Sequence, residues 1–271
     1  MNALIGERLS IVTNKAQTTR HRIFGILSGP DFQMVYSDTP GVLEPNYELQ
    51  ESMMRFVKAS LDDADVILYV VELGEKHEPS RLIEQVMNMG ATILLVINKI
   101  DQAKGTQLED KITYWREIHP DIEILPVSAL EKMNVDSLFT RIKENLPEHP
   151  PYFPEDQLTD KSEKFFAAEI IREKIFLNYK KEVPYSCEVE VEEFKEEEKI
   201  IRMRALIYVE RDSQKGIIIG HKGESLKKVG REARLDMEKF FEKKVFLETY
   251  VKVEKDWRKK ERSLKRFGYQ N

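Results

Sequence analysis

Cysteine is nearly missing from this sequence. Cys187 is the single cysteine among 271 residues. One thiol excludes an internal disulfide framework and any cysteine-rich metal site, and this sparing use of cysteine is typical of a reducing cytosol. The five histidines also lack a metal-ligand spacing, so we interpret His21 and His221 as solvated loop residues.

Long hydrophobic runs are absent as well. The longest, Val66–Val71 and Ile93–Ile97, are far shorter than the ~20 apolar residues that a membrane-spanning helix needs. The first ten residues, MNALIGERLS, contain no basic stretch followed by an apolar core, so no secretory signal is visible. With only 12 Gly and 11 Pro, the chain is neither collagen-like nor low in complexity. These absences predict a soluble cytoplasmic protein.

The charge is unevenly distributed along the chain. The formal net charge is −5, from 43 basic and 48 acidic residues. Residues 1–150 carry 15 basic and 23 acidic side chains, whereas residues 211–271 carry 18 basic and 10 acidic ones. A basic C-terminal block on an acidic chain indicates a polyanionic partner there, either nucleic acid or an anionic membrane surface, although a solvated helix face has the same composition.

The first half of the chain alternates short apolar runs with helical periodicity. We expect strands at Arg22–Leu27, Phe32–Tyr36, Val66–Leu73, Thr92–Ile97 and Ile122–Val127. We expect helices at Glu48–Ser60, Pro79–Met89, Thr106–Ile118 and Val135–Leu146. Continuous apolar strands separated by helices indicate a parallel sheet covered on both faces. We therefore predict a doubly wound α/β domain over residues 1–147.

A proline-rich linker at residues 148–157 separates a second predicted domain, residues 158–271, because neither a helix nor a central strand tolerates so many prolines. Two domains also suit the length of the chain. The expected elements beyond the linker are a helix at Ser162–Lys181, strands from Ser186 and at Lys199–Val209, a helical segment at Ser213–Phe241, a strand at Val245–Val253 and a helical tail at Trp257–Arg266. The order α-β-β-α-α-β predicts a small α+β domain.

Asp38-Thr39-Pro40-Gly41 follows the predicted strand DFQMVYS directly. Doubly wound sheets bind ligands at the carboxyl ends of their strands. A carboxylate at Asp38 can hold a water on a phosphate-bound Mg²⁺, and Gly41 lets a backbone N–H approach a terminal phosphate closely. An ordinary β-turn with a Pro-Gly pair explains this tetrapeptide equally well.

Asn98-Lys99-Ile100-Asp101 ends the strand ATILLVI, and Ser128-Ala129-Leu130 ends the next one. A carboxylate at Asp101 can accept hydrogen bonds from N1 and from the exocyclic amine of guanine, which adenine cannot supply. A site built around such bonds rejects analogues that lack them. Asn98 can contact another edge of the base, the stem of Lys99 can lie over the purine, and the Ala129 N–H can reach the guanine carbonyl. The alternative is a charged loop after a strand.

In this order, Asp38–Gly41, Asn98–Asp101 and Ser128–Leu130 resemble three of the five signature motifs of translation-factor-class GTPases. The segment GERLSIVTNKAQTTRHRIFGI is similar to the effector loop of the Era family, and that resemblance runs from Met1 to Asn271. It implies Mg²⁺ with bound GTP, sensed by Thr18 or Thr19 (we assign Thr19) and held through water by Asp38. The implied GTP-binding residues are Asp38, Thr39, Pro40, Gly41, Val42, Asn98, Lys99, Ile100, Asp101, Ser128 and Ala129.

The segment GIIIGHKGESLKK, residues 216–228, is similar to a KH RNA-binding signature, and α-β-β-α-α-β is the order of the type II KH fold. A tight loop with two glycines lets a nucleic-acid backbone approach, while apolar neighbours can support unstacked bases. The expected RNA-binding residues are Gly220, His221, Lys222, Gly223, Ile217, Ile218, Ile219, Lys227, Lys228 and Arg231.

The sequence departs from the family pattern in one large respect. No G-x-x-x-x-G-K-S phosphate-binding loop occurs in it. Met1–Gly6 resembles the second half of the helix that follows that loop. A sheet without the preceding strand would have open edges at two apolar strands. We therefore expect roughly twenty residues to be absent, with Met1 an internal methionine taken as the start.

Val42 stands where other GTPases carry a water-orienting glutamine, so the sequence identifies no catalytic group. The resemblance implies a monomeric GTPase that acts in 30S subunit maturation by binding the 3′ region of 16S rRNA. It also implies a weak association with the anionic inner-membrane surface, at the cytoplasmic side of the cell membrane. One alternative is an RNA-binding KH protein with a G-domain remnant that holds no nucleotide. Another is a basic tail that serves as a membrane-surface anchor.

Overall fold

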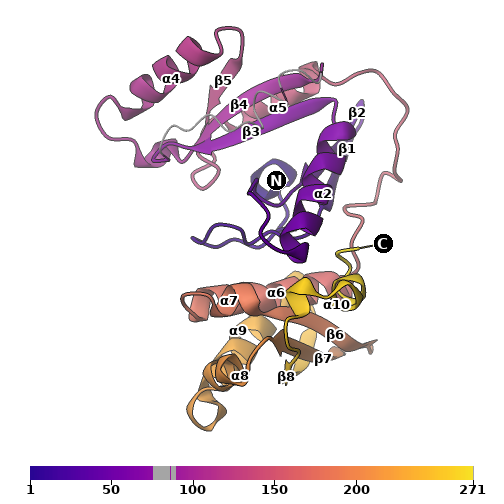
Figure 1. Cartoon of the computed structure of the whole chain (residues 1–271). Coiled ribbons are helices and arrows are strands. Elements are labelled where there is room, and N and C mark those ends of the chain that lie inside the picture. Colours follow the sequence, from indigo (N-terminus) through magenta and orange to yellow (C-terminus); the bar gives the residue numbers. More distant parts are fainter. Residues whose placement is uncertain (76–85, 87–89, 271) are drawn as a thin grey trace. The chain divides into compact units, whose positions relative to one another are not determined.

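The computed structural model describes residues 1–75, 86 and 90–270, and these residues form two compact units (Figure 1). The first unit comprises Met1–Arg8, Phe24–Ser37 and Lys58–Thr159. The second comprises Leu9–Ile23, Asp38–Val57 and Asp160–Asn271. The sequence-based division at the proline-rich linker therefore differs from the compact units, because two segments of the N-terminal half pack with the C-terminal half.

The N-terminal half contains nearly all of the expected elements. They are α1 Asn2–Ile5, β1 Ile23–Gly29, β2 Phe32–Asp38, α2 Glu48–Asp62, β3 Val66–Glu72, β4 Thr92–Asn98, the 3₁₀ turn η1 Ile100–Gln102, α4 Gln107–Ile118, β5 Glu123–Pro126 and α5 Val135–Glu144. Each expected boundary is reproduced within a few residues. The helix expected at Pro79–Met89 lies outside the described residues, apart from position 86.

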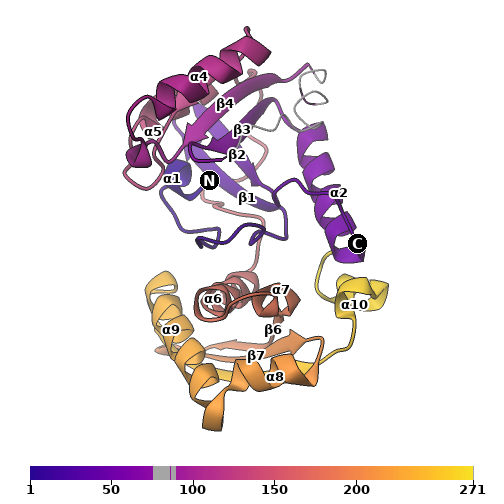
Figure 2. The same ribbon diagram turned by 60° about the vertical axis from the view of Figure 1, so that its left-hand side comes forward.

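The strands β3, β4 and β5 form a parallel sheet in that order, with helices near both faces (Figure 2). Alternate residues of β4 point to opposite sides, as the period of a strand requires. Leu95 packs in one cluster with Trp115 of α4, whereas Leu94 packs in another with Leu138 of α5. Because both faces are covered, β4 is apolar throughout, which confirms the doubly wound α/β prediction.

The strands β1 and β2 form a separate two-stranded sheet, so the described strands of the first unit do not make one continuous sheet. Met34 of β2 nevertheless joins the cluster of Leu94 and Val96. Val70 of β3 is 57% exposed although it lies in a continuous apolar run. The sheet is interrupted between β2 and β3, and at this interruption an apolar strand lies partly open to solvent.

The second unit contains a three-stranded sheet of order β6-β7-β8 with helices on one face. Its elements are α6 Glu163–Asn178, α7 Val183–Ser186, β6 Glu188–Glu196, β7 Ile200–Val209, α8 Asp212–Ile219, η2 His221–Gly223, α9 Glu224–Phe240, β8 Lys244–Val253, η3 Trp257–Lys259 and α10 Glu261–Arg266. The strand β7 pairs antiparallel with β6 and parallel with β8. Its buried face, with Met203, Ala205 and Ile207, forms the core with α6, α8 and α9. The predicted α-β-β-α-α-β order is confirmed.

Three predicted helices are interrupted in the structure. The first ends at Asn178, because Tyr179 is extended with a φ of −112° and a ψ of 157°, and the short helix α7 begins only at Val183. The second is broken at Gly220, whose φ is 69°. The C-terminal tail is broken at Lys260, which is extended. In each case the break occurs at backbone dihedrals that a continuous helix cannot contain.

Among the described residues, no helix combines the length and the apolar composition that crossing a membrane requires.

Candidate nucleotide and nucleic-acid sites

The predicted guanine-contacting residues of β4 and β5 meet in the first unit. The backbone N–H of Ala129 donates to Asn98 Oδ1 at 3.1 Å, and the Ser128 hydroxyl donates to Asp101 Oδ1 at 2.5 Å. Ser128 is fully buried, whereas Asp101 is exposed. A buried hydroxyl thus orients an exposed carboxylate, and that is the arrangement needed to present a fixed acceptor to a base.

The backbone between these side chains turns sharply. Lys99 adopts a left-handed φ of 67°, and the N–H of Ile100 then donates to the carbonyl of Val127 at 3.2 Å. The Lys99 ammonium lies 2.5 Å from Glu72 Oε1 on the surface. Exposed pairs of this kind contribute only about 0–1 kcal/mol to stability, so this contact influences the direction of the lysine stem more than the fold.

The residues predicted to face phosphate belong to the second unit. Asp38 ends β2, and its Oδ2 accepts a hydrogen bond from the Ser10 hydroxyl at 2.6 Å. Pro40 is buried, whereas Gly41 and Val42 are exposed. Nothing lies within 4 Å of a Cβ built on Gly41, so the space on that side of its backbone is open. Sequence reasoning missed Ser10, because a serine 28 residues before its partner produces no local pattern.

The donor set suits magnesium. Mg²⁺ is usually held by one or two carboxylates together with waters and substrate phosphates, so it needs no cluster of protein ligands. The described residues contain no group of three or more His, Cys, Asp or Glu that could hold a metal ion. The Asp38 carboxylate and the Thr19 hydroxyl, both in the second unit, are hard oxygen donors of the kind that Mg²⁺ prefers.

The predicted RNA loop joins α8 to α9 in the second unit. Gly220 and Gly223 have φ values of 69° and 81°, and Lys222 between them is left-handed at 49°. A Cβ on Gly220 would lie 2.2 Å from the Ser225 hydroxyl oxygen, so glycine is required there for space as well as for its dihedral angles. Gly223 is the N-cap of α9. Two glycines therefore fold the backbone into an exposed turn at a helix N-terminus, where backbone N–H groups favour anions.

Exposed basic side chains and one histidine surround this loop on the surface. His221, Lys222, Lys227, Lys228 and Arg231 are all exposed. The Lys228 ammonium lies 3.8 Å from Glu232 Oε1, one turn further along α9. The three lysines and Arg231 offer positive charge without burial, which suits contact with phosphates.

The structure corrects one member of the predicted apolar surface. Ile218 is fully buried in the core of the second unit, so it offers no surface to a base. Ile217 is 50% exposed and Ile219 is partly buried. A helical segment directs neighbouring side chains to different sides. Of the three isoleucines, Ile218 therefore belongs to the core, Ile217 to the surface, and Ile219 lies at the boundary between them.

A buried polar framework in the second unit was not foreseen from sequence. The Arg20 guanidinium donates to the carbonyls of Cys187 and Tyr185, both at 2.7 Å, and to Glu188 Oε2 at 3.1 Å. The Tyr269 hydroxyl donates to the same Glu188 oxygen at 2.5 Å. Burial, and secondly Glu188, raises the pKa of Tyr269 well above its ordinary value, so this phenol remains a donor. Partners more than 160 residues apart leave no signal in a local pattern.

His21 is part of this framework rather than a solvated loop residue. Its ring stacks on Tyr269 with centroids 4.2 Å apart and meets Phe165 edge-on. Loss of solvation lowers the pKa of His21 to about 3, with further contributions from the neighbouring cations Arg172, Lys161 and Arg20 against an opposing one from Glu188. The imidazole is therefore neutral at physiological pH. Burial likewise raises the pKa of the Cys187 thiol to about 12, which makes that thiol unreactive.

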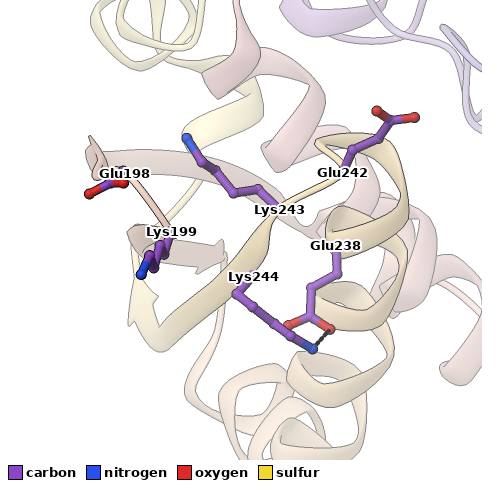
Figure 3. Close-up of a pocket in the computed structure, with 6 residues that line it drawn as sticks. All are labelled: Glu198, Lys199, Glu238, Glu242, Lys243 and Lys244. Carbon is purple, nitrogen blue, oxygen red and sulfur yellow. Dashed lines mark ion pairs between the residues drawn. The ribbon is translucent and has the colours of Figure 1, made fainter.

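A surface depression of about 470 Å³ lies elsewhere on the second unit, at the start of β7 and β8. Figure 3 shows three lysines and three glutamates around it, with Lys244 paired to Glu238. None of the predicted site residues lines it. Because its charges of opposite sign are balanced, it has no preference for an anion or a cation, and we assign it no role.

Comparison with known proteins matches both halves of the chain to described families. Residues 1–99 match the family described as 50S ribosome-binding GTPase, and residues 182–258 match the family described as KH domain. A protein named GTPase Era from Syntrophus aciditrophicus (strain SB) is 46% identical over 99% of this chain and 89% of its own length. A second GTPase Era, from Staphylococcus haemolyticus (strain JCSC1435), is 42% identical over 99% of this chain and 91% of its own length.

Two solved structures are similar over the whole chain. One is Era in complex with MgGDPNP and nucleotides 1506–1542 of 16S ribosomal RNA. It has a TM-score of 0.93 and 38% identity, covering 100% of this chain and 93% of the other. The second is a variant of Aquifex aeolicus Era bound to GDP·AlF4⁻, with the same score, identity and coverage.

Proposed function

The chain belongs to the Era family of GTPases, and on this premise we propose that it binds and hydrolyses GTP and binds 16S rRNA through its KH domain, as a factor in maturation of the 30S subunit. The observation that carries the proposal is the loop at Gly220–Gly223. Its left-handed backbone, its exposed cations and its place at the start of α9 together fit an RNA backbone. A solved Era structure holds a 16S rRNA fragment.

Guanine recognition is assigned to the first unit. Asp101 accepts from the base, oriented by Ser128, and Asn98 is held next to it by the N–H of Ala129. A nucleotide that cannot donate to Asp101 leaves its carboxylate without a partner, which is the physical source of specificity.

Phosphate and Mg²⁺ are assigned to Asp38–Val42 and Thr19. A solved Era structure contains MgGDPNP, and the Asp38 carboxylate and a threonine hydroxyl are suitable oxygen donors. Magnesium, when bound, neutralises charge on the phosphates. The exposed Val42 side chain is hydrocarbon, so it can exclude water but cannot orient it, and we assign no residue as general base.

The RNA assignment is tested by replacing His221 and Lys222 together with aspartate in the full chain. Both glycines remain, so the fold is retained while two carboxylates face phosphate. We expect RNA affinity to fall at least a hundredfold at about 0.1 M salt, since the Lys222 cation is lost and two carboxylates that repel phosphate are added. The matched control is Lys259→Asp with Lys260→Asp in the exposed tail, with the melting temperature recorded for each protein. The full chain is required because the second unit includes residues 9–23 and 38–57.

Two results contradict the RNA assignment. One is wild-type affinity in the double-aspartate variant. The other is loss of binding only in the tail control, which would favour the basic tail as the sole polyanion contact.

The nucleotide assignment has its own test. The sequence holds no phosphate-binding loop with its lysine, so we propose that this chain binds GTP weakly, since few groups compensate the phosphate charge. Isothermal titration with GTP and with ATP should give dissociation constants above the micromolar range and a preference for guanine. Micromolar GTP affinity contradicts the weakness. Equal affinity for both nucleotides contradicts guanine recognition and favours a KH protein with a G-domain remnant that holds no nucleotide.

We further propose that the protein acts as a monomer in the cytoplasm and that its basic C-terminal block gives weak affinity for anionic membrane surfaces. The net positive charge of residues 211–271 supports this. Vesicle co-sedimentation with and without anionic lipid tests it, and salt should abolish the binding.

A further inference from the structure

The segment Leu9–Ile23 is anchored on the C-terminal end of α6. The N–H of Val12 donates to Glu173 Oε2 at 3.0 Å, and the Tyr185 hydroxyl donates to the carbonyl of Ala16 at 3.3 Å. Between them, the ammonium of Lys15 donates to the carbonyls of both Phe176 and Tyr179. One part-buried lysine thus joins two carbonyls, three residues apart, at the end of a helix more than 160 residues further along the chain.

The position of Lys15 has a clear electrostatic reason. The last four carbonyls of a helix lack partners within the helix, and the negative end of its dipole attracts a cation. Phe176 and Tyr179 supply such carbonyls, since α6 ends at Asn178 with Tyr179 as its C-cap. Lys15 therefore fixes the end of α6, and with it the backbone from which the Tyr179 side chain projects.

Tyr179 continues the connection towards the RNA loop. Its hydroxyl donates to the carbonyl of Ile218 at 2.6 Å in a buried setting. Ile218 lies in the last turn of α8, two residues before Gly220, where carbonyls again lack helical partners. Burial raises the pKa of Tyr179 to about 12, so its hydroxyl keeps its proton at any physiological pH. The phenol therefore supplies a permanent donor at the base of the loop.

We propose that Lys15 and Tyr179 are positioning residues of the RNA site. Lys15 holds the end of α6, and Tyr179 at that end holds the Ile218 carbonyl, two residues before the Gly220–Gly223 loop. Neither side chain needs to touch RNA. The inference rests on the proposed function of that loop and deepens it.

The same connection gives the loop a form of regulation. Lys15 lies four residues before Thr19, which is assigned to magnesium, within one short segment of the second unit. Withdrawal of Lys15 would release the end of α6 and loosen the hold of Tyr179 on Ile218. Because coupling between sites is reciprocal, RNA bound at the loop must in turn stabilise the docked segment 9–23.

The test uses the full chain and an RNA with the sequence of nucleotides 1506–1542 of 16S rRNA. Tyr179→Phe removes only the hydroxyl, and Lys15→Met removes the ammonium while keeping a long unbranched stem. We expect each to weaken RNA binding about fivefold to tenfold, as the loss of one buried hydrogen bond implies. The double variant should be no weaker than the weaker single variant, because the two residues act in series. Lys15→Arg keeps a cation at the helix end and should retain affinity within about twofold.

Tyr185→Phe is the matched control, since it removes a hydroxyl bonded to the same segment but with no path to Ile218. Two readouts separate positioning from a merely structural role. The dependence of affinity on salt should stay at the wild-type slope in both positioning variants, whereas Lys222→Met should lower that slope by about 0.7. Hydrogen exchange of a peptide covering residues 9–19 should slow on adding RNA in the wild type, but not in Tyr179→Phe.

The outcomes separate failure of this inference from failure of the proposed RNA binding by the Gly220–Gly223 loop. A wild-type chain that fails to bind the RNA overturns both. A wild-type chain that binds, together with unchanged affinity in Tyr179→Phe or additive losses in the double variant, overturns only the inference. The same conclusion follows if RNA leaves exchange in residues 9–19 unchanged, or if Lys15→Arg is as weak as Lys15→Met.

Discussion

The loop assigned to guanine and the loop assigned to RNA both turn on a left-handed lysine, yet their surroundings differ. Lys99 has a φ of 67° and Lys222 a φ of 49°. Around Lys99 the neighbouring polar side chains are held by the protein itself, Asn98 by Ala129 and Asp101 by Ser128. Around Lys222 the cations are exposed, and the buried Tyr179 hydroxyl holds the Ile218 carbonyl, two residues before Gly220.

The difference follows from what each loop must read. One base differs from another in the positions of single hydrogen-bond donors and acceptors. The side chain that bonds to the base must therefore be oriented before the ligand binds. A phosphate backbone is attracted by charge and needs close approach, so side-chain freedom costs little there and backbone shape matters more. In the guanine loop the side chains are therefore preorganised, whereas in the RNA loop the backbone is preorganised.

The largest expected effect is on base choice. Asp101→Asn replaces an acceptor by a group that also donates, so guanine should lose its preference by up to ~10⁴ and xanthine should be favoured. Competition between GDP and XDP at millimolar concentration measures the ratio, which does not depend on absolute affinity. Asp110→Asn on α4 is the control. Retention of guanine preference in Asp101→Asn would show that the carboxylate does not read the base.

Gly220→Ala addresses the backbone of the other loop. The added Cβ would lie 2.2 Å from the Ser225 hydroxyl oxygen at a φ of 69°, so the loop must shift. Strain of about 1–3 kcal/mol corresponds to roughly tenfold to a hundredfold in RNA affinity. Gly230→Ala in α9 is the matched control, because its Cβ would meet only Thr249 Oγ1 at 3.7 Å. Equal RNA affinity in the two variants would refute the claim that backbone shape is what this loop preorganises.

The last effect is on stability rather than on binding, and it concerns the framework that supports the second unit. His21 has a folded pKa of about 3 against about 6.5 when unfolded, so the unfolded chain binds the extra proton between these values. Stability contributed by neutral His21 is fully present above pH 6.5 and is lost as pH falls, by up to about 1.4 kcal/mol per pH unit. Urea unfolding between pH 4.5 and 7 measures this slope, and His21→Phe should reduce it. His149→Phe is the control for loss of a histidine. If His21→Phe leaves the slope of the unfolding free energy against pH unchanged, the pH dependence comes from another group.

The sequence foresees the parts of this molecule that are encoded locally. Strand β4 is apolar throughout because both its faces are covered, and a short continuous apolar run between helices identifies such a strand. Asn98, Asp101 and Ser128 were predicted together because parallel strands end at one edge of a sheet, so successive strand ends converge. The Gly220–Gly223 loop was predicted from its similarity to a KH signature, in which two glycines permit a tight turn.

The roles that the sequence did not predict depend on partners that are distant in the sequence. The role of Arg20 comes from Cys187 and Glu188, more than 160 residues later, and that of Lys15 comes from the end of α6. His21 was interpreted as solvated because it lies in a predicted loop and forms no metal-ligand spacing, whereas the rings that enclose it belong to Phe56, Phe165 and Tyr269. Ile218 was counted as surface because periodicity alone does not say which of three adjacent isoleucines faces the core.

The sharing of the second unit between early and late segments has a consequence for synthesis on the ribosome. Residues 9–23 and 38–57 leave the ribosome long before their partners, since Arg20 bonds to groups 165 to 168 positions later. At about 5–20 residues per second, this interval lasts roughly ten to thirty seconds. Leu49 and Met53 pack with Trp257 and Leu264 in the finished protein. During synthesis these two side chains lack those partners and stay uncovered. The nascent chain therefore presents these apolar side chains to chaperones or to other chains until translation is nearly complete.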